Sequence, residues 1–429
     1  MKVLIAPDKF KGCLTAVEVA RAMREGLLDF LHIPDDEKLH DVQSSAEGGI
    51  EPFLASNHHE IRIQPIGDGG EGTMALICQA KPECRTETVS VLDARGSPAC
   101  ASYSVCQRPV QSGQAFIEMA SASGLAQIPE KERDPEHSTS YGTGQMILHA
   151  LQNGAREIYI GLGGSATIDG GGGMLQALGF EFRVAGKPMD LQNAVVSGHG
   201  CLADVLLQID DLTWSKEFAG LLQGTSLHIV ADVESPLHGE NGAIQRFAAQ
   251  KGLAPKRFPL YKQALESFAR ICEARAPLER RPGTEEFTSA HSFSAERGAG
   301  AAGGMGFALL LLGARMHAGF EFFCLQVGMD ALLDGVDLVI TGEGKLDGTS
   351  LAGKGPGGIA HLARKQNIPC IAICGKAEDR SHLEESCLFA DIREIGRGLS
   401  LEESMKRAAE LIRQEVRGAL KEGRYRGLS

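Results

Sequence analysis

Apolar and polar residues alternate in short blocks at the start of the chain. The apolar run Val3–Ala6 predicts a buried strand. Thr15 with Glu18 three positions later has the spacing of a capping box, which marks the start of a helix. The apolar residues that predict this helix recur every fourth position: Val19, Met23 and Leu27. This end of the chain therefore has the pattern of a strand followed by a helix.

The same alternation returns near the C-terminus. Leu338–Thr341 and Cys370–Cys374 are apolar runs typical of buried strands. Ser400 with Glu403 predicts the start of a last helix, which carries apolar residues along one face as far as Val416. Both ends of the chain thus consist of strand and helix units, whereas residues 34–60 are polar and irregular and predict a loop.

The middle of the chain has a different pattern. Val89–Leu92, Ala101–Cys106 and Ala115–Met119 are short strand-like runs at hairpin-like spacing, which favours a mixed sheet. A chain of 429 residues is also too long for one ordinary hydrophobic core.

We therefore predict an α/β fold with two domains. Residues 1–90 and 300–429 are expected to form a discontinuous, Rossmann-like domain with a parallel sheet. Residues 91–299 are expected to form an inserted α/β domain with a mixed sheet. The active site is expected in the cleft between the two domains.

Composition excludes several classes of protein. The net charge is −12 and no basic stripe is present, so nucleic-acid binding is not expected. The longest apolar run, Phe307–Leu312, is too short to span a bilayer, and the run before Pro7 is too short for a signal peptide. Eleven cysteines at irregular spacing indicate reduced thiols. We predict a cytoplasmic protein whose oligomeric state cannot be deduced from its sequence.

Five loops after predicted strands combine an acid with glycine or another small residue: Pro7–Gly12, Gly67–Thr73, Gly163–Gly173, Ala231–Pro236 and Gly342–Gly348. In open α/β sheets, ligands bind beyond the carboxyl ends of the strands. Phosphoryl transfer there needs glycine amides for phosphate, carboxylates for Mg²⁺, and an acid and a lysine near the attacking hydroxyl. Each loop alone is more often a simple turn, but the set of five favours an active site.

Three glycine motifs fit familiar ligand patterns less well. Gly161–Ala166 matches the dinucleotide pattern, but Asp169 follows it where a pyrophosphate would lie, which weakens a nicotinamide site. Gly298–Gly303 follows a polar segment instead of a strand, so close packing is the simpler interpretation. Gly348–Gly355 has P-loop spacing but lacks the hydroxyl after Lys354, so only that lysine remains a candidate phosphate contact.

The loops resemble those of the bacterial type-1 glycerate kinase family, both in their order along the chain and in their amino-acid sequences. The similar segments are Val3–Gly12, Pro65–Thr73, Ile117–Leu125, Tyr141–Gly144, Gly163–Gly171, Gly298–Gly304 and Ile340–Asp347. The resemblance extends from Met1 to the last helix. Segments 34–60 and 281–295 look longer than in the usual member, and their role is open. Lys9 stands where the family often has serine.

This resemblance implies a kinase that transfers the γ-phosphate of ATP to D-glycerate, with Mg²⁺. Close bacterial members are associated with 2-phosphoglycerate as the product, and 3-phosphoglycerate is the alternative. A kinase for another small hydroxy acid is a second hypothesis. A non-catalytic protein that binds sugar acids or nucleotides is a third, which the intact acids in all five loops disfavour.

Candidate site residues come from these loops. The candidate catalytic residues are Asp169, Asp232 and Lys11, with one of the two acids as base or hydroxyl-positioning group. Candidate substrate contacts are Asp8, Lys9, Phe10, Ser165 and Thr167. Candidate nucleotide or phosphate contacts are Gly69, Gly70, Gly163, Gly164, Glu343 and Lys354. Candidate Mg²⁺ ligands are Asp68, Glu71 and Asp347.

Overall fold

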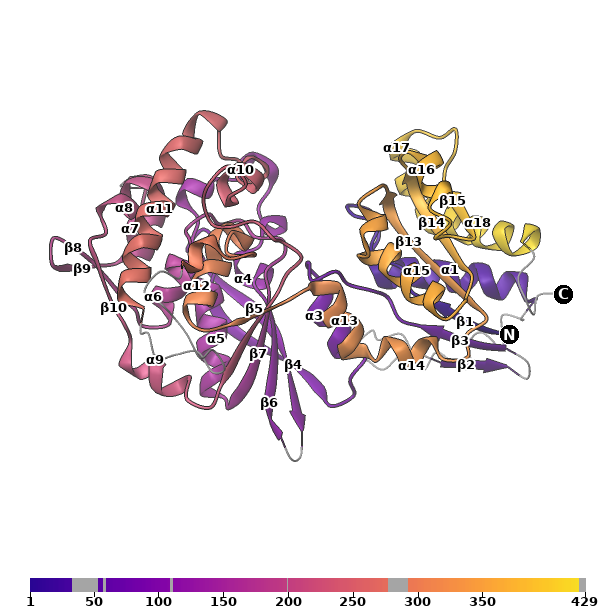
Figure 1. Ribbon diagram of the computed structural model, residues 1–429, viewed down its shortest axis with the longest axis horizontal. Coiled ribbons are helices and arrows are strands. Elements are labelled where there is room, and N and C mark those ends of the chain that lie inside the picture. Colours follow the sequence, from indigo (N-terminus) through magenta and orange to yellow (C-terminus); the bar gives the residue numbers. More distant parts are fainter. Residues whose placement is uncertain (33–52, 57–58, 109–110, 199, 277–291, 424–429) are drawn as a thin grey trace. The chain divides into compact units, whose positions relative to one another are not determined.

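A computed structural model describes residues 1–32, 53–56, 59–108, 111–198, 200–276 and 292–423 (Figure 1). The chain divides into two compact units, Met1–Asp68 with Phe323–Ser429, and Gly69–Phe322. The α/β class and the two kinds of sheet that the sequence predicted are confirmed. The unit boundaries follow residues 68 and 322, whereas the sequence placed them near 90 and 300.

The first unit contains a six-stranded sheet in the order β15-β14-β13-β1-β3-β2. Five strands are parallel, and β2 pairs antiparallel with β3 at the edge. Their bounds are β1 (Lys2–Ile5), β2 (Phe53–Ser56), β3 (His59–Ile63), β13 (Leu338–Leu346), β14 (Cys370–Ala377) and β15 (Asp391–Glu394). Since β1 lies between β3 and β13, the two chain ends share one sheet, as predicted.

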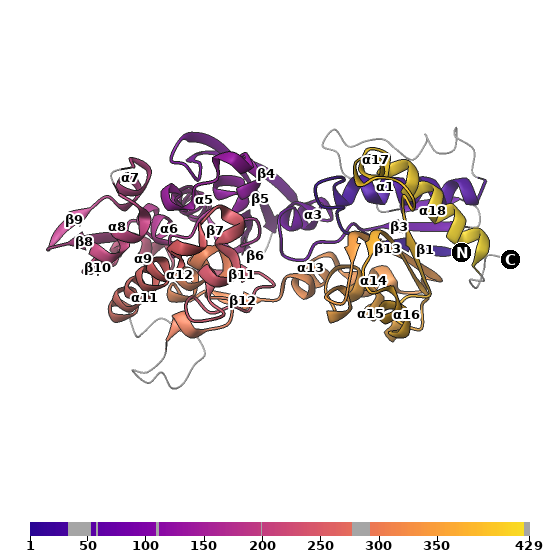
Figure 2. The same ribbon diagram turned by 90° about the horizontal axis from the view of Figure 1, so that it is seen from above.

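Helices cover both faces of this sheet. Figure 2 shows α1 (Ala16–Phe30) and α18 (Ala408–Glu422) on one face, with α14 (Met329–Leu333), α15 (Gly355–Lys365) and α16 (Arg380–Glu385) on the other. The short helix α17 (Leu401–Lys406) precedes α18. The Thr15–Glu18 capping box is present, as predicted. Helices α1 and α18 approach closely at Gly26, where a Cβ would lie 2.5 Å from the Arg413 carbonyl oxygen.

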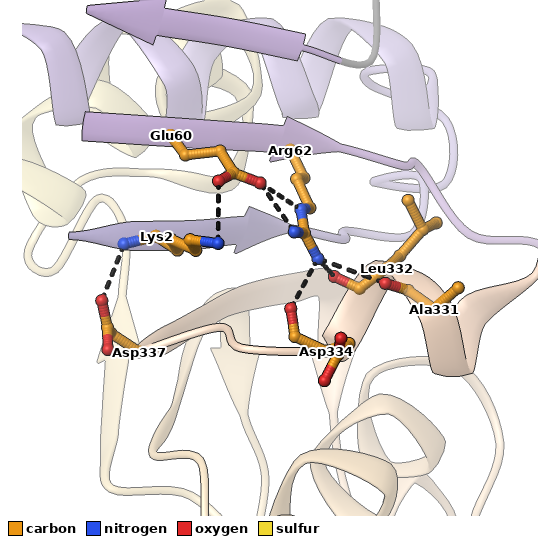
Figure 3. A network of polar contacts seen from close by, with 7 residues as sticks. All are labelled: Lys2, Glu60, Arg62, Ala331, Leu332, Asp334 and Asp337. Atoms are coloured by element: carbon orange, nitrogen blue, oxygen red, sulfur yellow. Dashed lines mark hydrogen bonds and ion pairs between the residues drawn. The ribbon is translucent and has the colours of Figure 1, made fainter. Parts of the chain in front are cut away.

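A polar network joins β1 and β3 to the C-terminal end of α14 (Figure 3). The Arg62 guanidinium donates to the carbonyl oxygens of Leu332 (2.7 Å) and Asp334 (2.9 Å), at the C-terminal end of α14. Glu60 joins Arg62 to Lys2, with N–O distances of 2.6 and 3.2 Å. The cation therefore satisfies carbonyl groups that a helix end leaves unpaired.

Two sequence predictions change in this unit. Residues 34–60 were predicted to be a loop, but 53–56 form β2 and 59–60 begin β3, because pairing with a neighbouring strand outweighs the weak local pattern. The rest of that segment, and most of 281–295, lie outside the described residues. Strand β13 continues to Leu346 instead of ending near Thr341, since it pairs with β14 as far as Ala377.

The second unit is built on a mixed sheet in the order β12-β11-β7-β6-β5-β4. The pairs from β12 to β6 are parallel, and β6-β5 and β5-β4 are antiparallel. The bounds are β4 (Cys84–Leu92), β5 (Pro98–Arg108), β6 (Gln111–Glu118), β7 (Ala155–Gly161), β11 (Ser226–Val230) and β12 (Arg315–His317). Helix α3 (Thr73–Gln79) packs on β4, β5 and β6, which explains why the unit begins before residue 90.

The remaining elements of this unit surround the mixed sheet. A small antiparallel sheet consists of β8 (Glu181–Val184), β9 (Lys187–Met189) and β10 (Asp211–Thr213). The helices are α4 (Ala120–Ser123), α5 (Tyr141–Gln152), α6 (Gly172–Ala177), α7 (Leu191–Val196), α8 (Leu202–Gln208), α9 (Lys216–Leu221), α10 (Ala243–Phe247), α11 (Phe258–Arg275) and α12 (Met305–Leu311). Helix α13 (Gly319–Val327) contains the second unit boundary.

The prediction that all cysteines are reduced thiols is wrong for two of them. Cys84 and Cys106 form a disulfide across β4 and β5, where they are directly opposite each other in the strand register. Sequence spacing could not reveal this pair, because the two cysteines are 22 positions apart and meet only when the hairpin forms. A bilayer-spanning helix, long and apolar throughout, does not occur in the described part of the chain.

Candidate active site

Four carboxylates gather at one end of the first unit's sheet. Asp8 follows β1, Asp68 follows β3, and Glu343 and Asp347 lie on β13 and directly after it. These three strands are adjacent and parallel, so their carboxyl ends meet at one edge. The Asp8 N–H donates to the Gly342 carbonyl at 2.8 Å, which fixes the first loop beside β13. We refer to Asp8, Asp68, Glu343 and Asp347 as the acidic cluster.

The acidic cluster concentrates negative charge. Burial raises the pKa of Asp8 to about 7, and the Asp68 charge adds to this effect, while the Lys9 N–H opposes it. Burial likewise raises the pKa of Glu343 to about 7; the hydroxyl of Ser350, 2.6 Å away, opposes the rise, and the charges of Asp8, Asp347 and Asp68 add to it. Each ionised carboxylate therefore makes its neighbours harder to ionise.

The donors of the acidic cluster fit a magnesium ion. Mg²⁺ prefers carboxylate oxygens and keeps several waters, so two of these acids would suffice to hold it. Burial is the main cause of the raised pKa of Asp8 and Glu343, and a divalent cation would offset the mutual repulsion that adds to it. Asp347 is held by Thr349, whose hydroxyl (2.5 Å) and N–H (2.9 Å) both donate to it, and these bonds lower its pKa.

The N-terminus of α15 adjoins the acidic cluster. Lys354 is the exposed N-cap residue of this helix, and a Cβ placed on Gly355 would lie 3.6 Å from an Asp8 carboxylate oxygen. The first-turn N–H groups of an 11-residue helix favour phosphate groups, as does a lysine beside them. This part of the first unit therefore combines carboxylates suited to a cation with donors suited to phosphate.

The three candidate residues that follow Asp8 in the first loop, Lys9, Phe10 and Lys11, differ in their contacts and exposure. The Lys9 N–H donates to Asp8 Oδ1 at 2.7 Å, and the Lys11 side chain is exposed. Phe10 is buried in the hydrophobic core of the first unit with Val19 and Met23. Core packing therefore accounts for Phe10 without a substrate contact.

In the second unit, residues 69–73 and the glycine loop 163–173 touch. A Cβ on Gly163 would lie 2.5 Å from the Gly70 Cα, and one on Gly164 would lie 3.3 Å from Glu71 Oε2. Glycine is needed at position 163, because a side chain there would displace the Gly70 backbone, and the positive φ of 75° at Gly164 also favours glycine. Of the candidate Mg²⁺ ligands, Glu71 thus belongs to the second unit, whereas Asp68 and Asp347 belong to the acidic cluster of the first.

Glu118, at the end of β6, holds the loop that leads into α3. It accepts from the N–H groups of Gly72 (2.9 Å) and Met74 (2.8 Å). Burial raises the pKa of Glu118, while these two N–H groups lower it and the charge of Glu71 raises it. Glu118 was not among the predicted site residues, although it lies in the segment Ile117–Leu125, which carries the family resemblance.

Asp169 is buried inside loop 163–173, with 1% of its surface exposed. Its Oδ2 accepts from the N–H (2.8 Å) and hydroxyl (2.7 Å) of Ser140 and from the Gly173 N–H (3.1 Å), and its Oδ1 accepts from the Gly171 N–H (3.1 Å). Ser140 and Gly171 are the N-cap residues of α5 and α6. Asp169 therefore ties two helix starts together, where its charge is favourable.

Asp232 is more accessible than Asp169. It follows β11, is half-buried, and accepts from the Gly319 N–H at 2.8 Å through Oδ1. A base must reach the proton that it removes, so the half-buried Asp232 suits that role better than the enclosed Asp169, although the Oδ2 atom of Asp232 is itself covered.

Lys251 contacts two of the candidate site residues, although no pattern in the sequence was a reason to select it. Its Nζ donates to Ser165 Oγ (2.6 Å) and to the Thr167 carbonyl (2.7 Å), and 2% of its surface is exposed. Burial lowers its pKa to about 7, and the Asp169 charge opposes this shift. The Thr167 hydroxyl is buried and has no hydrogen-bond partner among the described residues. The buried lysine thus holds the two candidate substrate contacts, Ser165 and Thr167, in place through its hydrogen bonds.

Comparison with known proteins gives one consistent result. A model of the glycerate kinase family matches residues 3–422. The chain is 35% identical over 383 residues to a glycerate 2-kinase of Escherichia coli K12, which covers 88% of this chain and 86% of the relative. It is 32% identical over 422 residues to a glycerate kinase of Bacillus subtilis 168, with coverage of 97% and 96%.

A solved structure is similar as well. A crystal structure from Salmonella typhimurium LT2, assigned as glycerate kinase 2, superimposes with a TM-score of 0.71 at 32% identity. The match covers 98% of this chain and 97% of that chain.

Proposed function

The chain belongs to the glycerate kinase family, and we propose that it transfers the γ-phosphate of ATP to a hydroxyl of D-glycerate. The family match over nearly the whole chain carries this proposal. The acidic cluster beside the α15 N-terminus supports it, because metal-binding and phosphate-binding groups lie where a kinase needs both.

In this proposal the first unit binds the nucleotide phosphates. Asp8, Asp68, Glu343 and Asp347 supply the carboxylates that would hold Mg²⁺, and Lys354 with the α15 N–H groups binds phosphate oxygens. The metal ion, when bound, neutralises the charge that builds up on the transferred group. Lys11 is exposed on the same first loop and supplies a further positive charge.

The second unit is proposed to hold the acceptor. Ser165 and Thr167 contact the small acid, and Lys251 fixes both from behind. Asp232 accepts the proton of the attacking hydroxyl, whereas Asp169 positions the loop through its four hydrogen bonds. The bond between the γ-phosphorus and the β–γ bridging oxygen of ATP breaks, ADP leaves with that electron pair, the phosphoryl group bonds to the acceptor hydroxyl oxygen, and the hydroxyl proton passes to the Asp232 carboxylate.

Three finer points stay predictions. The product is proposed to be 2-phosphoglycerate, since one relative carries the name glycerate 2-kinase. The placement of the active site in the cleft between the two domains, and a cytoplasmic location, also remain predictions from the sequence.

The proposal is tested by measuring ADP release with ATP and Mg²⁺ in the presence of D-glycerate, tartronate or a longer sugar acid. Turnover with D-glycerate at least tenfold more efficient than with the other acids supports it. Faster turnover of another acid would show a kinase of different specificity, and binding without turnover would show a non-catalytic protein.

A further inference from the structure

Three cysteines of the second unit lie together, and none of them has a role in the proposed kinase reaction. Cys84 opens β4 and Cys106 lies on β5; they form a disulfide with a Cα–Cα distance of 4.0 Å. Cys78 lies near the end of α3, which packs on both strands. The three sulfur atoms lie within 4.8 Å of one another. A free thiol therefore stands beside both sulfurs of a disulfide.

We propose that Cys78, Cys84 and Cys106 form a thiol–disulfide exchange site. The Cys78 thiolate attacks the Cys106 sulfur, a Cys78–Cys106 bond forms, and the Cys84–Cys106 bond breaks. The electron pair of the broken bond leaves on the Cys84 sulfur, which takes up the proton that Cys78 lost. The exchange moves the cross-link from β4–β5 to α3–β5 with no net oxidation. This inference does not depend on the proposed kinase activity.

Burial decides which sulfur leaves. Cys106 is fully buried, whereas Cys84 is half-exposed at the start of its strand. A thiolate is less costly where water can solvate it, so Cys84 is the better leaving group and Cys106 the sulfur that is attacked.

Burial of Cys78 also determines the rate of exchange. Burial raises the pKa of Cys78 to about 11, while the Ser104 hydroxyl and the Lys81 charge oppose this rise. Only the thiolate attacks, so exchange is slow at neutral pH and its rate rises about tenfold per pH unit below that pKa.

The exchange also changes which element is covalently linked to strand β5. Helix α3 has seven residues and begins directly after loop 67–72, whose Gly72 is held by Glu118. With the Cys84–Cys106 bond, only β4 and β5 are joined covalently. With a Cys78–Cys106 bond, the last turn of α3 is tied to β5.

Peptide mapping detects the exchange directly. The oxidised protein is incubated at pH 7, 8 and 9, quenched with acid, alkylated and digested with Glu-C and chymotrypsin. Cleavage after Glu83 separates Cys78 from Cys84, and cleavage after Tyr103 separates Cys100 from Cys106. We expect Cys78–Cys106 linked peptides that form about tenfold faster per pH unit. Their absence after prolonged incubation at pH 9 would overturn the proposal.

Three variants sharpen this test. Cys84→Ser treated with glutathione disulfide should form the Cys78–Cys106 bond, releasing two glutathione molecules for each bond made. Cys78→Ser should form only Cys84–Cys106, and Cys100→Ser, an exposed cysteine on the same strand β5, should behave like the unmodified protein. A Cys84→Ser protein with native circular dichroism whose Cys78 and Cys106 both stay alkylatable would contradict the proposal. If Cys84→Ser does not fold, the pH series on the unmodified protein decides.

Discussion

Lys251 Nζ lies 2.6 Å from Ser165 Oγ, and the lysine is almost completely buried. A second hydrogen bond of 2.7 Å joins the same ammonium to the Thr167 carbonyl. A buried cation is expensive unless hydrogen bonds and a nearby anion compensate for lost hydration. Ser165, Thr167 and the charge of Asp169 provide that compensation, so the shape of loop 163–173 depends on this lysine.

Replacing this lysine should therefore damage catalysis. Lys251→Met keeps the length of the side chain but removes both hydrogen bonds, leaving a buried carbonyl unpaired at a cost of about 1–3 kcal/mol. We expect kcat/KM for D-glycerate to fall about 10- to 100-fold, measured by ADP release. Lys256→Met, an exposed lysine of the same unit, is the matched control and should retain full activity. Equal activity of the two variants would remove Lys251 from the site.

The lowered pKa of Lys251 predicts a pH dependence of stability. The pKa falls from 10.5 to about 7 on folding, so between these pH values the unfolded chain binds more protons than the folded one. Stability should therefore rise with pH across this window, by up to about 1.4 kcal/mol per pH unit from this group. Urea unfolding at pH 7 to 9.5 should show a steeper rise for the natural protein than for Lys251→Met. Parallel curves would be the contrary result.

Changing each of the two candidate acids of the second unit to an amide should have different effects: on stability for Asp169 and on catalysis for Asp232. Asp169→Asn puts an NH₂ group among four hydrogen-bond donors, so the free energy of unfolding should fall by about 2–4 kcal/mol. Asp232→Asn should lower kcat at least about 100-fold with little change in melting temperature. Thermal unfolding and steady-state kinetics on both variants check this. The reverse pattern, a stable but inactive Asp169→Asn, would make Asp169 the catalytic acid.

The acidic cluster predicts a trade-off between stability and metal binding. The pKa of Asp8 rises from 3.8 to about 7 on folding, so its contribution to stability is present below pH 4 and is lost as pH rises through 7. Without Mg²⁺ at pH 8, Asp8→Asn should therefore melt at a higher temperature than the natural protein. Adding Mg²⁺ should raise the melting temperature of the natural protein more than that of the variant.

The same substitution should weaken the use of magnesium. We expect Asp8→Asn to need at least about tenfold more Mg²⁺ for half-maximal ATP turnover, since one carboxylate donor is lost. Asp330→Asn, an exposed acid on α14 of the same unit, is the control and should leave the requirement unchanged. An unchanged Mg²⁺ requirement in Asp8→Asn would exclude Asp8 as a ligand.

Local patterns predicted much of the fold. The Thr15–Glu18 capping box and the strands at both chain ends depend on neighbouring residues, which any sequence window contains. Strand β2 and the continuation of β13 to Leu346 escaped prediction, because pairing with a neighbouring strand forms them. The cross-strand partner of Cys84 was hidden for the same reason.

The candidate site was predictable as a set of loops but not as a set of roles. Its acids could be identified because carboxylates follow strands whose ends meet at one edge of a sheet. The burial of these acids could not be predicted from the sequence, and it is burial that distinguishes Asp169 from Asp232. No local pattern marked Lys251 as a site residue, since a lysine between glutamine and glycine looks like any surface lysine. Its partners Ser165 and Thr167 are 86 and 84 positions away in the sequence, and only the folded chain brings them together.

The central claim, transfer of phosphate from ATP to D-glycerate, is tested most directly by a phosphorus NMR spectrum of the purified protein with ATP, Mg²⁺ and D-glycerate. A new phosphomonoester resonance that matches 2-phosphoglycerate, growing in step with ADP, is the predicted result. A spectrum in which ATP persists unchanged, or releases only inorganic phosphate, would contradict the account.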